Sequence, residues 1–495
     1  MLNRRRLFSP GNQMPPFVFI RRYEYVRSMR RFPRWKFFSE VSPPRGWQAD
    51  GKGPSIWDTF CHEEGHVCGA QTGDVTCNSY ELWEKDLKCI QQLGLTHYRL
   101  SLSWSRLLPD GTTGHVNQKG VQYYNKVIDD LLSCDVSPMV TLYHFDLPQS
   151  LQDRGGWKTP AIASLFDGYA RFCFQTFGDR VKLWLTINEP YVCAKYGHED
   201  GVHAPGLKEA GTTAYLAAHN MLRSHVMAWH SYDSLYRPKQ GGAVSLAINS
   251  DWFEPFRPEH AADVAASDRS LAFTLGWFAW PLFVTGDYPD VMRAAIDAQS
   301  SNLGYDGSPR LPAFSEDEPS ALGTADFFAL NYYTSRKVKH GYVGQRRICM
   351  KHDRDTEDVL DPNWSICGAP WLAVVPCGLR KLLNYIKDTF GDPVVYITEN
   401  GFCQTGPLVM EDAQRGEFYK ETIQEVEKAI GEDGVNVRGY FAWSLLDNFE
   451  WADGFDLRFG LFHVDFSDPE RRRTIYRSGL EYAGIISKCK AVHSK

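Results

Sequence analysis

Short apolar runs alternate with longer amphipathic stretches from about Gly46 to the end of this 495-residue chain. The apolar runs are rich in β-branched and aromatic residues, which is typical of buried strands. The longer stretches repeat apolar residues at helical spacing. Strands are predicted at 96–103, 138–143, 183–189, 243–248, 326–333, 394–399 and 437–444. Helices are predicted near 79–92, 118–133, 160–177, 211–232, 260–280, 377–390, 411–430 and 476–488. This order of βα units favours an α/β fold, a (β/α)8 TIM barrel with long loops after the strands.

One strand is missing from this list, because closing a parallel barrel takes eight and only seven are predicted. The eighth should precede the first helix, in the region before Gly46, where the sequence is least strand-like. Pro43 and Pro44 would remove ladder hydrogen bonds from a central strand. We therefore expect the first strand to be absent or replaced in this chain.

Residues 1–45 differ in composition from the rest of the chain. They hold ten Arg and one Lys against Glu24 and Glu40, a charge of +9, and show no clear periodicity. We interpret them as a disordered or non-native extension, with a targeting segment as the alternative. Residues 46–495 are expected to form a single barrel domain.

The charge and the cysteines limit the class of protein. The chain has a net charge of −6, so the part after residue 45 carries −15, which argues against nucleic acid as a partner. The twelve Cys contain no CxxC pair and no Cys/His metal spacing, which favours reduced packing residues of a cytoplasmic protein. No apolar run is long enough to span a membrane. The sequence predicts no particular oligomeric state.

Two of the predicted strands end in a glutamate beside an asparagine. They read Leu-Trp-Leu-Thr-Ile-Asn-Glu-Pro at 183–190 and Val-Val-Tyr-Ile-Thr-Glu-Asn-Gly at 394–401. An unpaired carboxylate at the end of a buried strand is costly, and active sites of barrels lie at the C-terminal strand ends. Either glutamate alone could be a structural ion-pair partner. Together, Glu189 and Glu399 would form the carboxylate pair that glycoside hydrolysis requires.

Other chemically useful side chains also fall at or near predicted strand ends. Arg99 would place its charge inside the barrel and needs an anion there, which a carboxylate nucleophile supplies. His144 could instead be a buried histidine with satisfied hydrogen bonds, and Trp443 could simply fill the mouth of the barrel. The joint occurrence of these residues favours an active site. The remaining candidates of this kind are Asn249, Asn331 and Tyr333.

Three motifs carry a resemblance to a known family. Thr-Ile-Asn-Glu-Pro at 186–190, Ile-Thr-Glu-Asn-Gly at 397–401 and Ala-Trp-Ser-Leu-Leu-Asp-Asn-Phe-Glu-Trp at 442–451 resemble the signatures of family-1 glycoside hydrolases. These enzymes are retaining β-glycosidases on a (β/α)8 barrel. The likeness extends from about Gly46 to the last helix, and segments 51–60 and 95–106 are most similar to the cytosolic vertebrate members.

The resemblance implies roles for particular residues. Glu189 would be the general acid/base and Glu399 the nucleophile, with Arg99 and Tyr333 in contact with Glu399. Asn188 would hold the sugar 2-hydroxyl. The other residues implied to bind substrate are His144, Asn249 beside Glu189, Trp371 on the aglycone side, Trp443, Glu450 and Trp451, with His203 near the entrance. The implied substrates are small β-glucosides, and also galactosides and fucosides, with hydrophobic aglycones. No metal and no cofactor are implied, because two carboxylates suffice.

One segment of the family pattern is not found. The family's first strand ends in a Tyr-Gln…Glu-Gly segment whose Gln binds glycone hydroxyls, and no counterpart precedes Gly46. Gln48 lies after the point where the familiar sequence resumes and does not take this place. The alternative function is therefore a catalytically impaired or sugar-binding-only paralogue.

Overall fold

Eight parallel strands form a closed barrel in the computed structural model, which describes residues 37–40, 48–74, 76–307 and 309–493. Their order around the barrel is β1-β11-β10-β7-β5-β4-β3-β2. The strands are β1 (Phe37–Glu40), β2 (His97–Ser101), β3 (Ser137–Tyr143), β4 (Leu183–Asn188), β5 (Ala243–Asn249), β7 (Phe328–Asn331), β10 (Val395–Asn400) and β11 (Val437–Trp443). The predicted (β/α)8 barrel is confirmed.

The first strand of the barrel is the short β1. It pairs in parallel with β11, where Ser39 is in register with Trp443, and with β2, where Ser39 is in register with Arg99. A four-residue strand thus takes the position for which the sequence predicted an absent or replaced strand. The rest of the expected extension over residues 1–45 lies outside the described residues.

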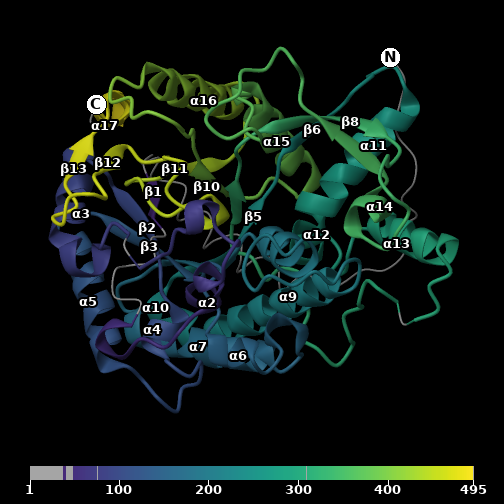
Figure 1. Ribbon diagram of the computed structural model, residues 1–495, viewed down its shortest axis with the longest axis horizontal. Coiled ribbons are helices and arrows are strands. Elements are labelled where there is room, and N and C mark those ends of the chain that lie inside the picture. Colours follow the sequence, from purple (N-terminus) through teal and green to yellow (C-terminus); the bar gives the residue numbers. More distant parts are fainter. Residues whose placement is uncertain (1–36, 41–47, 75, 308, 494–495) are drawn as a thin grey trace.

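Helices surround the strands as a ring (Figure 1). All the helices predicted from the sequence are found: α3 (Ser79–Leu93), α5 (Gln118–Ser133), α7 (Ile162–Phe177), α9 (Thr213–Ser231), α11 (Ala261–Leu271), which a π-helical turn joins to α12 (Trp277–Phe283), α15 (Pro376–Thr389), α16 (Ala413–Gly431) and α17 (Arg477–His493). Their apolar stripes face the barrel. In α15, for example, Leu379, Leu382, Leu383 and Ile386 are buried, which is the spacing of one helix face.

The connections between the barrel strands and helices contain elements that the sequence did not predict. A three-stranded sheet of β6 (Trp252–Pro255), β8 (Ser335–His340) and β9 (Thr356–Val359) follows β5 and β7. A hairpin of β12 (Phe462–Val464) and β13 (Arg473–Ile475) follows β11. The added helices are α2 (Ile56–His62), α4 (Trp104–Leu107), α6 (Gln149–Gln152), α8 (Pro190–Val192), α10 (Arg237–Gln240), α13 (Asp290–Asn302) and α14 (Met350–Arg354).

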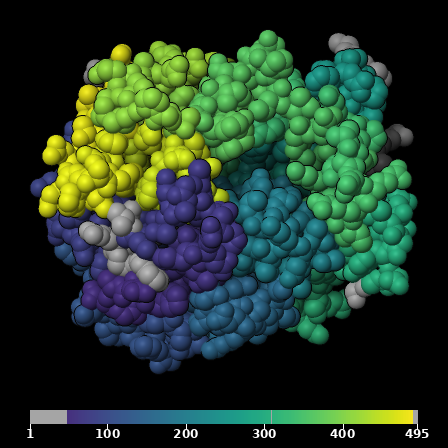
Figure 2. All heavy atoms as spheres, in the orientation of Figure 1, coloured from purple at the N-terminus to yellow at the C-terminus, as the bar shows by residue number. Residues whose placement is uncertain are grey.

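Apolar side chains fill part of the barrel interior. Met139, Leu185, Ala247, Ala329 and Phe441, from five different strands, belong to one buried cluster. A barrel packed in this way is not a pore, so the site must be built at the C-terminal strand ends and the loops that follow them. In the orientation of Figure 1, Figure 2 shows a face hollowed near its centre, between blue and teal segments on one side and green and yellow segments on the other.

Candidate active site

Glu399 lies near the end of β10 and is 4% exposed. The guanidinium of Arg99, which comes from β2 across the barrel, donates from Nη1 to its Oε1 at 2.6 Å. The hydroxyl of Tyr333 donates to its Oε2 at 2.9 Å. Each carboxylate oxygen therefore has a donor, which stabilises a buried anion and fixes its orientation.

Arg99 is itself held on every side. Its Nε donates to Thr141 Oγ1 at 3.1 Å, and Nη1 also donates to the carbonyl oxygen of Thr398 at 3.1 Å. Its Nη2 donates to Asn188 Oδ1 at 2.7 Å. With a side chain 1% exposed, this guanidinium is a fixed positive charge beneath Glu399 and not a mobile surface group.

Glu189 lies between β4 and the short helix α8, directly after the one and before the other. Its φ of +41° lies in the left-handed region, which a non-glycine residue adopts at a cost, as is common at functional sites. Asn331 Nδ2, at the end of β7, donates to its Oε1 at 2.7 Å. Burial, and after it the nearby charge of Glu399, raises the pKa of Glu189 to about 8. Glu189 is therefore protonated at neutral pH.

A continuous hydrogen-bond network joins the two glutamates, which are 210 positions apart in the sequence. Asn331 Nδ2 donates to Asn188 Oδ1 at 3.1 Å as well as to Glu189. Arg99 donates to that same amide oxygen and to Glu399. Thr398 Oγ1 completes the network by donating to Asn331 Oδ1 at 2.6 Å. The barrel thus brings both carboxyl groups to one site, one of them protonated and one beside a guanidinium.

His144 borders this network at the end of β3. Asn188 Nδ2 lies 3.0 Å from His144 Nε2, so Nε2 accepts and the ring hydrogen is on Nδ1. Burial, and secondarily the charge of Arg99, lowers the pKa of His144 well below its usual value, and the ring is neutral. It stacks near Trp443 and Trp451, with centroids 6.0 and 5.6 Å away. Within the described part of the chain His144 Nδ1 has no hydrogen-bond partner, which leaves one buried donor available to a ligand.

Glu450 lies in the turn after β11. Trp443 Nε1 donates to its Oε1 at 3.2 Å, and burial is the main cause that raises the pKa of Glu450 to about 8. The next residue, Trp451, has φ of +56° and packs against Phe145, with ring centroids 4.9 Å apart. This turn therefore contributes a polar group and an aromatic face, the combination with which sugars are bound.

The remaining predicted residues lie around these groups. Trp371 is 43% exposed, and its ring meets that of Tyr333 edge-on at 6.2 Å, at the outer side of the site.

Asn249, at the end of β5, has a buried Oδ1 without a partner among the described residues. Its partner in register on β7 is Asn331, which donates the hydrogen bond to Glu189 described above. His203 packs edge-on against Trp57 at 5.6 Å.

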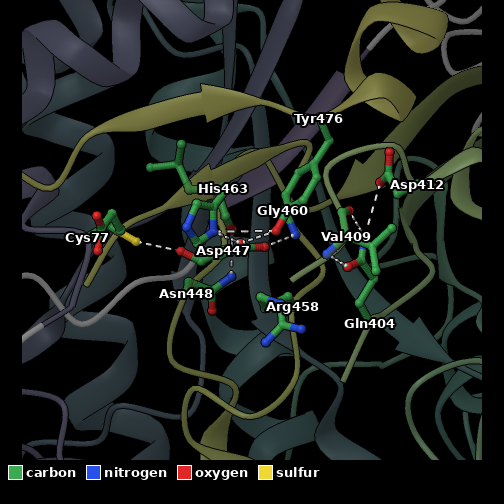
Figure 3. Close-up of polar contacts among 12 residues, drawn as sticks. Cys77, Gln404, Val409, Asp412, Asp447, Asn448, Arg458, Gly460, His463 and Tyr476 are labelled. Atoms are coloured by element: carbon green, nitrogen blue, oxygen red, sulfur yellow. Dashed lines mark hydrogen bonds and ion pairs between the residues drawn. The ribbon is translucent and has the colours of Figure 1, made fainter. Parts of the chain in front are cut away.

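Asp447 is a buried residue for which no role is predicted from the sequence, although it lies within the 442–451 motif. Its Oδ1 accepts from the backbone N of Gly460 at 3.0 Å, and its Oδ2 accepts from His463 Nδ1 at 3.1 Å and Tyr476 OH at 2.7 Å (Figure 3). Cys77 Sγ donates to its backbone oxygen at 2.9 Å. The carboxylate thereby ties the turn that carries Glu450 and Trp451 to the segment around β12 and to the residue before α17.

Comparison with known proteins agrees with this geometry. Residues 45–491 match the family "Glycosyl hydrolase family 1". The chain is 55% identical over 443 residues to the cytosolic beta-glucosidases of Cavia porcellus and Homo sapiens, which covers 89% of this chain and 94% of each relative. The solved structure of an aphid myrosinase is similar with a TM-score of 0.88 at 38% identity, covering 92% of this chain and 99% of that one. The chain therefore belongs to glycosyl hydrolase family 1.

Proposed function

We propose that this protein is a retaining β-glucosidase in which Glu189 is the general acid/base and Glu399 the nucleophile. The observation that carries the proposal is the pair itself: two glutamates joined by one network, in opposite electrostatic environments. Glu189 has a raised pKa and is protonated, whereas Glu399 faces the buried guanidinium of Arg99. Two carboxyl groups in such different surroundings are suited to acid and nucleophile roles.

In the first step, Glu189 donates its proton to the glycosidic oxygen and the aglycone leaves as an alcohol. Glu399 attacks the anomeric carbon and forms a covalent glycosyl ester. In the second step, Glu189, now ionised, removes a proton from water, and the resulting hydroxide displaces Glu399 from the sugar. Two inversions give net retention, and this route requires carboxyl groups about 5 Å apart.

The glycone is expected to bind between the His144 side and the turn of Glu450 and Trp451. The Nδ1 of His144, which has no partner among the described residues, and the oxygens of Glu450 can hydrogen-bond either an equatorial or an axial 4-hydroxyl. We therefore propose β-glucosides as substrates, with galactosides and fucosides tolerated. Trp371 at the outer side suits a hydrophobic aglycone.

Hydrolysis of aryl β-D-glucoside, followed by proton NMR of the sugar as it is released, tests this function. We expect β-glucose to appear first and to mutarotate afterwards, and an aryl β-galactoside to be hydrolysed as well. Release of α-glucose would show inversion and contradict the nucleophile role of Glu399. Binding of glucose without turnover would instead support the sugar-binding alternative. Closure of the barrel by β1 argues against that alternative, as does the presence of both glutamates.

The pH dependence of kcat/KM should report the proton on Glu189. Because burial and Glu399 raise its pKa to about 8, the acid is present below that pH and lost above it. We expect kcat/KM on an aryl glucoside to fall about tenfold per pH unit above pH 8. Glu450 has a pKa of about 8 as well, so the control is Glu450→Gln. In this variant kcat/KM should be lower at its maximum but should fall above pH 8 in the same way. If that fall disappeared, the titrating group would be Glu450 and not Glu189.

Asp447 is proposed as a positioning residue that acts through Glu450. In Asp447→Asn an amide nitrogen faces the donors His463 and Tyr476, which leaves buried groups unsatisfied and should cost about 1–3 kcal/mol of stability. We expect KM for aryl glucoside to rise about tenfold with kcat changed less. The matched control is Asp465→Asn, a surface carboxylate that accepts from Ser467 and should leave the kinetics unchanged. Equal kinetics for both variants would contradict the positioning role.

A cytoplasmic location is also proposed. The two beta-glucosidases reported above are named cytosolic. Separately, none of the helices in the described ranges combines the length and apolarity of a membrane span. Residues 1–45, apart from β1, are proposed as an extension of the barrel domain. Fractionation of the native protein tests the location: recovery in an organelle fraction would favour a targeting role for this segment.

A further inference from the structure

Two cysteine thiols meet behind the aglycone side of the site. Cys403 follows β10 four residues after Glu399, and Cys367 lies in the loop between β9 and α15. Their sulfur atoms are 3.1 Å apart. Cys403 is fully buried, whereas Cys367 is partly exposed. None of the catalytic steps above uses either thiol.

Backbone contacts hold the two thiols together. Gly368 N donates to the carbonyl oxygen of Cys403 at 3.0 Å, and Ala369 N donates to Cys403 Sγ at 3.1 Å. A Cβ on Gly368 would lie 2.6 Å from the carbonyl carbon of Gln404, so only glycine permits this approach. The short distance between the sulfur atoms thus follows from the packing of two backbone segments, and not from a chance rotamer.

The same loop carries Trp371. An antiparallel bridge between Ile366 and Ala373 and the bond from Cys367 N to Leu372 O, at 3.1 Å, form it into a narrow hairpin. Its inner side belongs to a buried cluster with Cys403 and Trp443. A bond between Cys367 and Cys403 would therefore connect the loop that carries Trp371 to the end of β10, the strand that carries Glu399.

We propose that Cys367 and Cys403 are a redox-modification site, at which peroxide forms a disulfide that fastens the Trp371 loop to the end of β10. The oxidant is hydrogen peroxide or an organic hydroperoxide. The bond is reversible by thiol reductants.

The partly exposed Cys367 is the thiol that peroxide can reach. The hydrogen bond from Cys403 lowers the pKa of Cys367 to about 7, so a substantial fraction is thiolate at neutral pH. This thiolate attacks the peroxide oxygen, the O–O bond breaks, and protonation of the departing hydroxide gives water and a sulfenic acid. The sulfur of Cys403 then attacks the sulfenic sulfur and loses its proton, and the hydroxyl of the sulfenic acid leaves as a second water. Two thiols and one hydrogen peroxide thus yield one disulfide and two waters.

Little rearrangement is needed for this bond. Sulfur atoms in a disulfide are about 2.0 Å apart, so the present separation must shorten by about 1 Å. The linked segments already share backbone hydrogen bonds, and we therefore expect the oxidised protein to retain its activity on aryl glucoside within about twofold. The cross-link encloses α15 and β10, and it should raise the thermal midpoint by a few degrees.

Peptide mapping of the full chain after hydrogen peroxide treatment, without reduction, tests the proposal. We expect a mass loss of two hydrogens and a linked peptide pair that contains Cys367 and Cys403, and both should revert with dithiothreitol. Cys367→Ser and Cys403→Ser should each lack the linked pair and the gain in thermal midpoint. Cys377→Ser, which removes an exposed cysteine nearby on α15, should oxidise as the unmodified protein does.

Two results would overturn the proposal. One is sulfinic or sulfonic acid on Cys367 with Cys403 still a thiol, and the other is peroxide linkage of other cysteines while this pair stays reduced. Because the readout is chemical, it does not depend on the proposed hydrolase function. Failure of glucoside hydrolysis with formation of the linked pair would reject the function alone.

Discussion

Replacing Glu399 with Gln should lower kcat on an aryl β-glucoside by at least about 10⁴-fold, because an amide cannot form the glycosyl ester. Gln keeps the shape of the side chain and one carbonyl oxygen that can accept from Tyr333 or Arg99. It removes the negative charge, however, and leaves the buried Arg99 without its ion-pair partner. The expected loss thus combines the missing nucleophile with a disturbed guanidinium.

This second effect calls for a control of folding. Breaking a buried ion pair can cost about 3–5 kcal/mol, so thermal unfolding and circular dichroism of the variant must accompany the kinetics. Glu417→Gln is the matched control, since Glu417 lies on α16, is exposed and pairs only with Lys420 among the described residues. It should keep full activity.

Covalent labelling gives a test that needs no variant. A 2-deoxy-2-fluoroglucoside with a good leaving group forms the glycosyl ester but hydrolyses it slowly, so the intermediate accumulates. We expect the label on the peptide that contains Glu399. A folded Glu399→Gln protein with substantial turnover, or a label on another carboxylate, would remove Glu399 from the mechanism.

The barrel could be predicted from the sequence because its strands and helices have distinct periods. β10 reads as a continuous apolar run that ends in Glu399 and Asn400, and α15 repeats leucine at helical spacing. The tips of parallel strands meet at one end of a barrel, so placing Glu189 and Glu399 together followed from topology alone. The sequence motifs indicated the family, and the match of residues 45–491 to the family confirms it.

Hydrogen bonds between the ends of nearby strands could not be predicted in the same way, because they depend on register and depth. Nothing in the sequence shows that Asn331 donates to Glu189, since Asn249 ends an apolar strand as well. The hydrogen bond from Thr398 to Asn331 requires both side chains to lie on the same face of the barrel wall. A shift of one residue in the pairing of β10 with β7 would place them on opposite faces. These residues become visible only when the strands are aligned.

Short strands and loop elements also escape the pattern. β1 has four residues, too few to show alternation, and it was not located. The sheet of β6, β8 and β9 consists of short segments that lie far apart in the sequence and pair with one another only in the folded chain. Asp447 is hidden for a related reason, because its partners Gly460, His463 and Tyr476 are assembled by the hairpin after β11.

Replacing Glu189 with Ala should have an effect that depends on the leaving group. An alkyl β-glucoside needs a proton on its departing oxygen, so kcat/KM should fall about 10³-fold, within the range that general acid catalysis contributes. A dinitrophenyl β-glucoside leaves as a stable anion and needs no acid. Its kcat/KM should therefore change little, although kcat should fall because the glycosyl ester now waits for an unassisted water. The basic limb above pH 8 should disappear from kcat/KM in the same variant, since the group that titrates there is gone.

Azide separates the two roles of Glu189. This anion is a nucleophile that needs no general base, and it can enter the space that the truncated side chain leaves beside Asn331. We expect azide to restore kcat on the dinitrophenyl substrate and to yield β-glucosyl azide. This configuration follows because azide attacks the anomeric carbon on the face opposite its bond to Glu399. The matched control is Asn331→Ala with Glu189 intact, which should show a shifted basic limb and no response to azide. Rescue in that control, or α-glucosyl azide from the Glu189→Ala protein, would contradict the assignment of Glu189 as the acid/base opposite Glu399.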